Sequence, residues 1–265
     1  MQPLSVVVLA AGLGTRFGGR KQLAGVAPDG AAIFAVLVRR AAEAAFDHAA
    51  VVIAPDMAEE VRAHLGALPG LGIDVELVTQ ERPRGTADAV LAARDAVEGP
   101  FAVVNGDDLY PVDGFGALRE HLVHGPADEH ALVAFRVGRT RAGNRRVMRA
   151  RIEVDAAARL IGIREGAVLP GAGGMQFEID GEVHTLDAEA LVSMNMWGFR
   201  PSIFDALATA VDGFRAAPRD GEVYLPDAVA AEVANGVAVR VLVSEEPCLG
   251  VTYAEDLDAV RSTLR

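Results

Sequence analysis

The chain has 265 residues and 51% of them are hydrophobic, which is enough for a sizeable core and excludes a disordered polypeptide. Its 37 acidic residues outnumber its 25 basic residues, and the formal net charge of −12 argues against nucleic acid or an anionic membrane as a partner. The one cysteine, Cys248, excludes an internal disulfide and a cysteine metal cluster.

The first half of the chain alternates apolar strands with amphipathic helices. Val6–Ala10 is a continuous apolar run, and a glycine-rich loop follows it. This alternation is typical of an α/β fold with a doubly wound, mostly parallel sheet that binds ligands at the carboxyl ends of its strands. The other predicted elements are helices over Ala31–Phe46, Met57–Leu68 and Thr86–Val97 and strands over Ala50–Ala54, Val75–Thr79 and Phe101–Asn105.

The pattern changes after about His130, where strands follow one another without helices between them. We expect this half to extend the same mixed sheet, so that residues 1–265 form one domain. A glycine cluster at Gly171–Gly174 predicts a mobile loop. The predicted strands are Ala131–Val137, Arg149–Val154, Leu160–Arg164, Glu182–Leu186, Leu191–Phe199 and Val237–Val243, and the predicted helices are 201–211, Leu225–Ala234 and Ala254–Leu264.

The loop within Leu9–Lys21 has the residue types that bind phosphate. Its glycines let backbone N–H groups approach an anion, and Arg16, Arg20 and Lys21 add positive charge. The dinucleotide fingerprint is excluded because Phe17 stands where its third glycine is required, and the Walker loop is excluded because an arginine precedes Lys21. A glycine-rich turn with surface arginines is the alternative.

The run Leu-Ala-Ala-Gly-Leu-Gly-Thr-Arg followed by Lys-Gln-Leu resembles the signature of the sugar-1-phosphate nucleotidyltransferases (NDP-sugar pyrophosphorylases), and the likeness covers most of the chain. The spacing is similar to that of a bacterial branch with R-[FY]-G-G-x-K-Q-L. The resemblance implies a Rossmann-like fold of the nucleotide-diphospho-sugar transferase type, with the nucleotide in residues 1–130 and the acceptor in residues 131–265. It implies that Arg16 and Lys21 contact the phosphates, and that the nucleotide-binding backbone comes from Ala10, Ala11, Gly12, Gly14 and Thr15.

An acidic turn, Asn-Gly-Asp-Asp-Leu-Tyr at Asn105–Tyr110, follows the strand that ends at Asn105. Carboxylates at a strand end suit Mg²⁺, although a turn stabilised by Asp107 or Asp108 is the plainer interpretation. The resemblance implies that Asp107 is the catalytic magnesium ligand and that Asp108 could assist. The second metal ligand is unknown, because Gly250 falls where many relatives have an aspartate; Glu246, Asp227 and Asp256 are open candidates.

Two further segments point to ligand binding. In Gln80–Asp88, Thr86 is a predicted helix N-cap. The resemblance implies that Gln80 reads a pyrimidine base and that Gly85 and Thr86 pack against it. The segment Ser193–Phe199 alternates Asn195 and Trp197 with methionines, so that these two side chains could bind a sugar, unless the strand is simply buried. The resemblance adds Glu165 as a sugar-hydroxyl ligand.

Seven arginines lie between residues 136 and 151. A solvated hairpin, a flap over anionic ligands and a subunit contact are the three interpretations. The six histidines are interpreted as surface or structural residues. Lys21 is the one lysine among 24 arginines, so that a compact ammonium stands in the phosphate loop of a chain that otherwise uses arginine.

The predicted activity is Mg²⁺-dependent transfer of a nucleoside monophosphate from an NTP, UTP or dTTP, to a sugar 1-phosphate with release of pyrophosphate. The alternatives are a cytidylyltransferase with a non-sugar phosphate or cofactor acceptor, and a non-catalytic nucleotide-sensing subunit. No apolar run is long enough for a membrane span and the N-terminus lacks a basic leader, so we expect a cytoplasmic protein. The oligomeric state stays open.

Overall fold

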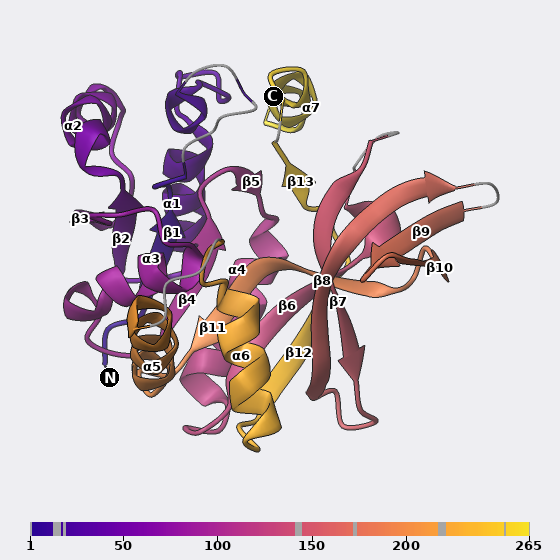
Figure 1. Ribbon diagram of the computed structural model, residues 1–265. Helices are drawn as coiled ribbons and strands as arrows, with labels where there is room; N and C mark the ends of the chain where they lie inside the picture. The colour runs from indigo at the N-terminus through magenta and orange to yellow at the C-terminus, as the bar shows by residue number, and fades with distance from the viewer. Residues whose placement is uncertain are drawn as a thin grey trace.

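The computed structural model describes residues 2–12, 17, 20–140, 145–171, 174–216, 221–251 and 253–264. Within these residues, one sheet of eleven strands runs through both halves of the chain and carries helices on both faces (Figure 1). The prediction of a mixed sheet with a parallel core is confirmed. Because strands from both halves share the sheet, we propose that they form one domain. No helix in the described part is long and apolar enough to cross a membrane.

The parallel core of the sheet comes from the first half. Its strands are β1 (Ser5–Leu9), β2 (His48–Ile53), β3 (Asp74–Thr79) and β4 (Phe101–Asn105), in the order β3-β2-β1-β4. Val6 and Val8 pack on one face of β1 and Val7 packs on the other, which is why this strand is apolar throughout. The chain order reverses at β1, so that the carboxyl ends of β1 and β4 border a ligand crevice.

The helices form two layers. On one face the core contains α1 (Ile33–Glu43), α2 (Ala58–Ala67), α4 (Val112–His124) and α7 (Asp256–Thr263). On the other face it contains α3 (Thr86–Ala92), α5 (Ile203–Ala216) and α6 (Leu225–Ala234). The sheet is therefore covered on both sides.

One helix that the sequence did not predict is α4. Glycines at 114 and 116 weaken its helical signal, since an interior glycine costs about 1 kcal/mol relative to alanine. Gly114 is needed for packing, because a Cβ there would lie 2.8 Å from the sulfur of Met196. The close approach of α4 to the sheet thus explains a residue that looks unfavourable locally.

The second half adds an antiparallel arm and a branch. The arm consists of β7 (Val147–Val154), β8 (Leu160–Gly171), β9 (Gly174–Ile179) and β10 (Glu182–Leu186). The branch consists of β6 (His130–Arg136) and β12 (Val239–Ser244), both reached through β11 (Leu191–Phe199). β9 was not predicted: Gly171 and Gly174 are register partners of a hairpin, although residues 172 and 173 lie outside the described part.

β11 changes partners along one edge. Val192 and Ser193 pair with β7, whereas Trp197 to Phe199 pair with β4. The register shifts between Ser193 and Met196, and Asn195 has a left-handed φ of 59°. This kink places Asn195 next to the carboxyl end of β4.

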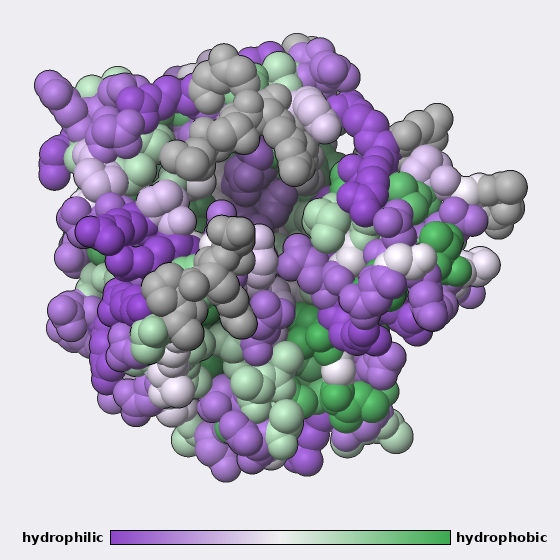
Figure 2. Space-filling model, in the orientation of Figure 1, coloured by the Kyte–Doolittle hydropathy of each residue, from purple (hydrophilic) through white to green (hydrophobic). Residues whose placement is uncertain are grey.

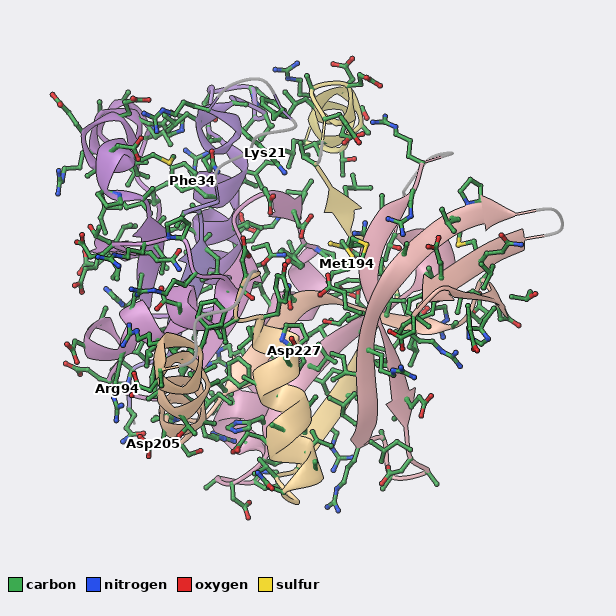
Figure 3. The ribbon with its side chains drawn as sticks, in the orientation of Figure 1. Lys21, Phe34, Arg94, Met194, Asp205 and Asp227 are labelled. Carbon is green, nitrogen blue, oxygen red and sulfur yellow. The ribbon has the colours of Figure 1, made fainter. Side chains whose placement is uncertain are left out.

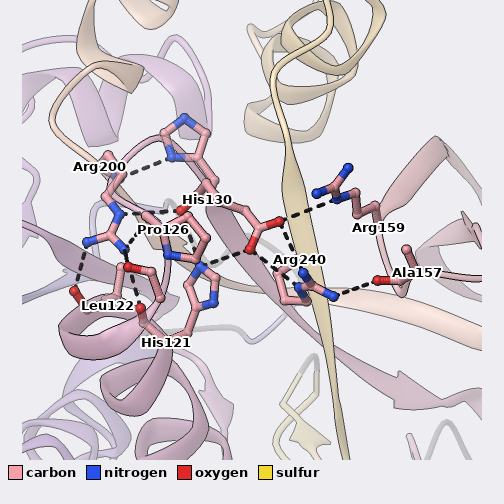
Figure 4. Close-up of polar contacts among 10 residues, drawn as sticks. His121, Leu122, Pro126, His130, Ala157, Arg159, Arg200 and Arg240 are labelled. Carbon is pink, nitrogen blue, oxygen red and sulfur yellow. Dashed lines mark hydrogen bonds and ion pairs between the residues drawn. The ribbon is translucent and has the colours of Figure 1, made fainter.

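A buried polar cluster ties α4 to the ends of β6 and β11 (Figure 4). The Arg200 guanidinium donates to the carbonyls of Leu122 and Pro126, both at 2.7 Å, and to those of His121, Gly125 and Glu129 at 3.3 Å. A cation at a helix C-terminus satisfies carbonyls that have no partner within the helix. The side chain of Glu129, only 3% exposed, contacts Arg159 and Arg240.

Candidate active site

A cleft of about 410 Å³ opens at the carboxyl ends of β1 and β4. The space-filling view shows this face hollowed, with hydrophilic residues at the base of the hollow (Figure 2). Residues from both halves of the chain line the cleft. It is lined by Leu9, Ala10, Ala11, Gly12, Gln22, Gln80, Pro83, Gly85, Thr86, Ala89, Asn105, Gly106, Asp107, Asn195 and Glu222.

The structure therefore brings together most of the residues predicted for the nucleotide. Ala10, Ala11 and Gly12 follow β1, while Gln80 follows β3. The expected phosphate ligands Gly14, Thr15 and Arg16 lie outside the described residues. Arg20 faces away, toward Asp56 and Glu60 on the surface.

Lys21, at the end of the loop that follows β1, contacts the acidic turn after β4. Its ammonium lies 2.6 Å from the Asp107 carboxylate, and the lysine side chain is only 9% exposed whereas that of Asp107 is 41% exposed. Figure 3 labels Lys21 in this upper part of the molecule, with Met194 across from it on β11. The pair joins the predicted phosphate contact to the predicted metal ligand, and Asp107 of this pair lines the cleft.

The loop backbone is held by a buried glutamine. The Gln22 amide, 7% exposed, donates to the Gly12 carbonyl oxygen. That bond turns the Gly12 carbonyl oxygen toward Gln22, so a side chain from the short turn at Lys21–Leu23 shapes the loop after β1. In the sequence, this role is indicated by the position of Gln22 directly after Lys21 in the Lys-Gln-Leu motif.

Gln80 has a fixed orientation at the cleft. Its amide nitrogen donates to Asp88 at 2.9 Å and to the Gly85 carbonyl at 3.1 Å. Arg84 and Arg215 also contact the Asp88 carboxylate, at 3.6 and 3.4 Å, so that this carboxylate serves as an acceptor for all three side chains. The amide oxygen of Gln80 is therefore the group left for a ligand, since no described residue donates to it.

The predicted helix start is correct, but Thr86 is not its N-cap. The N-cap is Gly85 at φ 109°, and the Thr86 hydroxyl instead accepts a hydrogen bond from the backbone N–H of Leu225 at 2.8 Å. A Cβ on Gly85 would lie 2.6 Å from the Val223 carbonyl. Gly85 and Thr86 therefore hold this wall of the cleft against Val223 and the start of α6.

Asp108 lies behind Asp107 and is bonded to its own turn. Its carboxylate accepts hydrogen bonds from Asn105 at 3.0 Å and from Tyr110 at 3.3 Å. Burial, followed by the negative charge of Asp107, raises the pKa of Asp108 to about 6. Its strand β5 (Asp108–Leu109) pairs with β13 (Leu249–Gly250), and a Cβ on Gly250 would lie 2.9 Å from Asp108 Oδ1.

The donor set fits Mg²⁺ only with help from a ligand. No group of three histidine, cysteine, aspartate or glutamate side chains in the described part could hold a metal ion. Asp227, Glu246 and Asp256 therefore do not complete a cluster with Asp107. Mg²⁺ needs only one or two carboxylates when substrate phosphates and waters supply the other oxygens, and Asp107 at the cleft meets that requirement.

A smaller cavity of about 70 Å³ adjoins the cleft and shares Asn105 and Asn195 with it. Glu165, a predicted acceptor residue, lines this cavity, where partial burial and then the charge of Asp227 raise its pKa. The cavity lies where β11 leaves β7. Its other lining residues are Asp108, Met148, Arg149, Ala150, Ser193, Met194 and Pro226.

Trp197 does not line either cavity. It is fully buried and stacks on Phe199 with ring centroids 5.7 Å apart, so no face is left to stack on a sugar. Its indole N–H instead donates to Asn195 Oδ1 at 3.1 Å. The expectation of a tryptophan platform is wrong for this side chain, which positions Asn195 so that the amide NH₂ is the group available to a ligand.

The arginine-rich segment is largely a set of surface ion pairs. Arg136 and Arg139 contact Glu245, Arg145 contacts Glu255, and Arg146 contacts Glu178. Arg141 lies outside the described residues. Arg149 differs, because it lines the small cavity. Neither Arg149 nor Asp88 stands out in the sequence, because only their neighbours in space distinguish them from other charged residues.

Three comparisons with known proteins bear on the family and the fold of this chain. A family model described as the MobA-like NTP transferase domain matches residues 6–217. The bifunctional protein GlmU of Aquifex aeolicus is 27% identical over 277 residues, covering 99% of this chain and 53% of that protein, so the chain spans about half the length of this relative. The structure of the inositol-1-phosphate CTP transferase from T. maritima has a TM-score of 0.71 at 13% identity, covering 100% of this chain and 98% of that one.

Proposed function

The chain belongs to the MobA-like NTP transferase domain family, a family of nucleotidyltransferases, and we propose that it transfers the nucleoside monophosphate of a pyrimidine NTP to a phosphorylated small molecule. The observation that carries the proposal is the Lys21–Asp107 pair beside the cleft at the ends of β1 and β4. An ammonium and a carboxylate at one point suit a triphosphate and its divalent cation.

In the proposed reaction, an oxygen of the acceptor phosphate forms a bond to the α-phosphorus of the NTP. The bond between that phosphorus and the bridging oxygen breaks, and pyrophosphate leaves with the electron pair. No general base is required, because a phosphate monoester with a second pKa near ~6 is mostly dianionic at neutral pH. Catalysis then consists of aligning two anions and stabilising the charge that develops.

The resembled motif and the lining of the cleft support the following roles. Lys21, together with Arg16 of the predicted phosphate loop, would bind the triphosphate. Asp107 would hold Mg²⁺, which when bound supplies positive charge to the phosphate oxygens. Gly12 and Gln80 both line the cleft. In this proposal, the Gly12 backbone would contact the phosphates and the Gln80 amide oxygen would contact the base.

The free amide oxygen of Gln80 is a hydrogen-bond acceptor, which supports a pyrimidine base that presents a hydrogen-bond donor to it. Uracil and thymine offer N3–H, and cytosine offers its amino group. UTP or dTTP with a sugar 1-phosphate is the first candidate, since Glu165 and Asn195 at the adjoining cavity suit hydroxyl groups. CTP with a polyol phosphate is the second, because Gly250 stands at the position of the resembled aspartate and a CTP transferase shares the fold over the full chain.

A pyrophosphate-release matrix tests this function. UTP, dTTP, CTP, ATP and GTP are each combined, with Mg²⁺, with glucose 1-phosphate, N-acetylglucosamine 1-phosphate, inositol 1-phosphate and glycerol 3-phosphate. We expect release with one pyrimidine triphosphate and one acceptor class. Tight nucleotide binding without turnover in every cell of the matrix would overturn the proposal in favour of a nucleotide-sensing subunit.

A further inference from the structure

Arg149 is a partly buried cation whose charge no described carboxylate neutralises within ion-pair distance. Four other arginines of the segment 136–151 have such partners, at 2.6 to 3.3 Å. Arg149 stands on β7 at the rim of the small cavity, opposite Gly166 of β8. In a chain with 37 acidic residues, an arginine left without a carboxylate inside a cavity needs an explanation.

One edge of the Arg149 guanidinium is free. Nη1 donates to the carbonyl of Met148 at 2.8 Å. Nε is buried and has no hydrogen-bond partner, and Nη2 has none among the described residues. The Nε–H and Nη2–H groups are parallel, which matches two oxygens of one phosphate. A buried donor without a partner is unfavourable, so a ligand oxygen that restores the hydrogen bond is favoured.

The surroundings of this edge are acidic and adjoin the reaction site. Asp108 and Glu165 line the same cavity, so an anionic acceptor can enter only beside a cation. Lys21 is already paired with Asp107. The cavity shares Asn105 and Asn195 with the cleft, which puts an anion held by Arg149 next to the place proposed for the NTP.

Gly250 keeps this place open. A Cβ on Gly250 would lie 3.4 Å from Arg149 Nη2 and 2.9 Å from Asp108 Oδ1. Any larger side chain at this position would therefore crowd the free edge of Arg149. Gly250 thus leaves room for a ligand at this edge.

We propose that Arg149 binds the phosphate of the acceptor through its Nε–Nη2 edge and so selects acceptors that carry a phosphate monoester. This inference rests on the proposed function, because it assigns the acceptor side of the same site. It makes Arg149 a substrate-binding residue, and it distinguishes this residue from the surface ion pairs of the same segment.

The test compares Arg149→Gln with wild type, using Arg151→Gln as the matched control, since Arg151 is exposed two positions along the same strand and does not line the small cavity. Binding of inorganic phosphate is measured by calorimetry on protein saturated with Mg²⁺ and a nonhydrolysable analogue of the preferred NTP. The KM values of the best acceptor and of the NTP are measured by pyrophosphate release. Circular dichroism checks that each variant is folded.

We expect Arg149→Gln to weaken phosphate binding and to raise the acceptor KM by about 10- to 100-fold, the range for a charge-assisted hydrogen bond. The NTP KM and both properties of Arg151→Gln should stay within about threefold of wild type. Arg149→Lys, which keeps the charge but loses the paired donors, should recover only part of the loss.

Three outcomes overturn the proposal: an unchanged acceptor KM, an equal loss in Arg151→Gln, or a rise in the NTP KM alone. Failure of the proposed function gives a different result. If no acceptor is turned over but phosphate binding still depends on Arg149, the anion site stands and the transferase assignment falls. Turnover with an acceptor KM that does not respond to Arg149 leaves the transferase and removes the site.

Discussion

Arg200 and Arg149 show how one residue type takes two roles in this protein. Arg200 is 8% exposed, and its guanidinium is enclosed by backbone carbonyls from α4 and the loop after it. Arg149 lies at the rim of a cavity with a buried Nε that has no partner. The difference teaches that a satisfied buried cation holds elements together, whereas an unsatisfied one at a cavity marks a place for a ligand.

The largest expected effect is on stability, at Arg200. Arg200→Met keeps the aliphatic stem but leaves several buried carbonyls unpaired, and we expect the free energy of unfolding to fall by about 4 kcal/mol. Urea unfolding measures this change. Arg149→Gln should change the same quantity by less than about 0.5 kcal/mol, because among the described residues it loses one hydrogen bond, that to the Met148 carbonyl. Equal losses in the two variants would show that the two arginines do not differ in their contribution to stability.

Lys21 should show the opposite behaviour to Arg200, with activity lost and the fold kept. We expect Lys21→Ala to lower kcat by about 10²- to 10³-fold, the usual cost of one preorganised charge partner. Pyrophosphate release measures the rate and thermal unfolding checks the fold. An unimpaired variant contradicts the assigned role.

Lys21→Arg is the sharper form of the same experiment. It keeps the charge but replaces a compact ammonium with a planar fork next to Asp107. We expect reduced turnover with Mg²⁺ present. Full activity would mean that the lone lysine reflects only the arginine-rich composition of the chain.

The Arg200 cluster also predicts a pH dependence of stability. His130 Nδ1 accepts the backbone N–H of Arg200 at 3.1 Å, and burial, followed by the charge of Arg200, lowers the pKa of His130 to about 4. The unfolded chain, with a histidine pKa near ~6.5, binds more protons between these values, so stability is full above pH ~6.5 and falls as the pH drops toward 4. The loss should reach roughly 3 kcal/mol.

His130→Asn provides the control for this pH effect, because its amide oxygen can accept the same hydrogen bond without titrating. Urea unfolding from pH 7 to pH 4 should give a shallower decline for the variant than for wild type. Parallel curves would show that other groups cause the acid sensitivity.

The smallest expected effect concerns the base. Gln80 lines the cleft, and Gln80→Met removes its amide oxygen while keeping the length of the side chain. We expect the KM of the preferred NTP to rise about 3- to 10-fold, which corresponds to the loss of one neutral hydrogen bond. The ratio of kcat/KM between the preferred NTP and the other triphosphates should decrease. Glu81→Gln, next to it but exposed, is the control and should leave both unchanged. A KM that does not respond to Gln80 would remove its role in reading the base.

The amino-acid sequence by itself determined the parts of this protein whose signals are local. The alternation of apolar runs with amphipathic helices specifies a parallel core, because a strand covered on both faces must be apolar along its length. Because the carboxyl ends of parallel strands lie at the same edge of a sheet, the loop after β1 and the acidic turn after β4 could be placed together from the sequence. Arg16 of that loop lies outside the described residues, so its role stays a prediction.

Only the tertiary structure decided the roles that depend on partners distant in the chain. Asp88 orients Gln80 from eight positions away, Gly114 looks unfavourable until Met196 is placed against it, and Trp197 is buried because β4 and β6 flank it. The same holds for Arg149 and Arg200, which are equivalent as letters. Whether a guanidinium is enclosed by carbonyls or left open at a cavity depends on distances that no local pattern encodes.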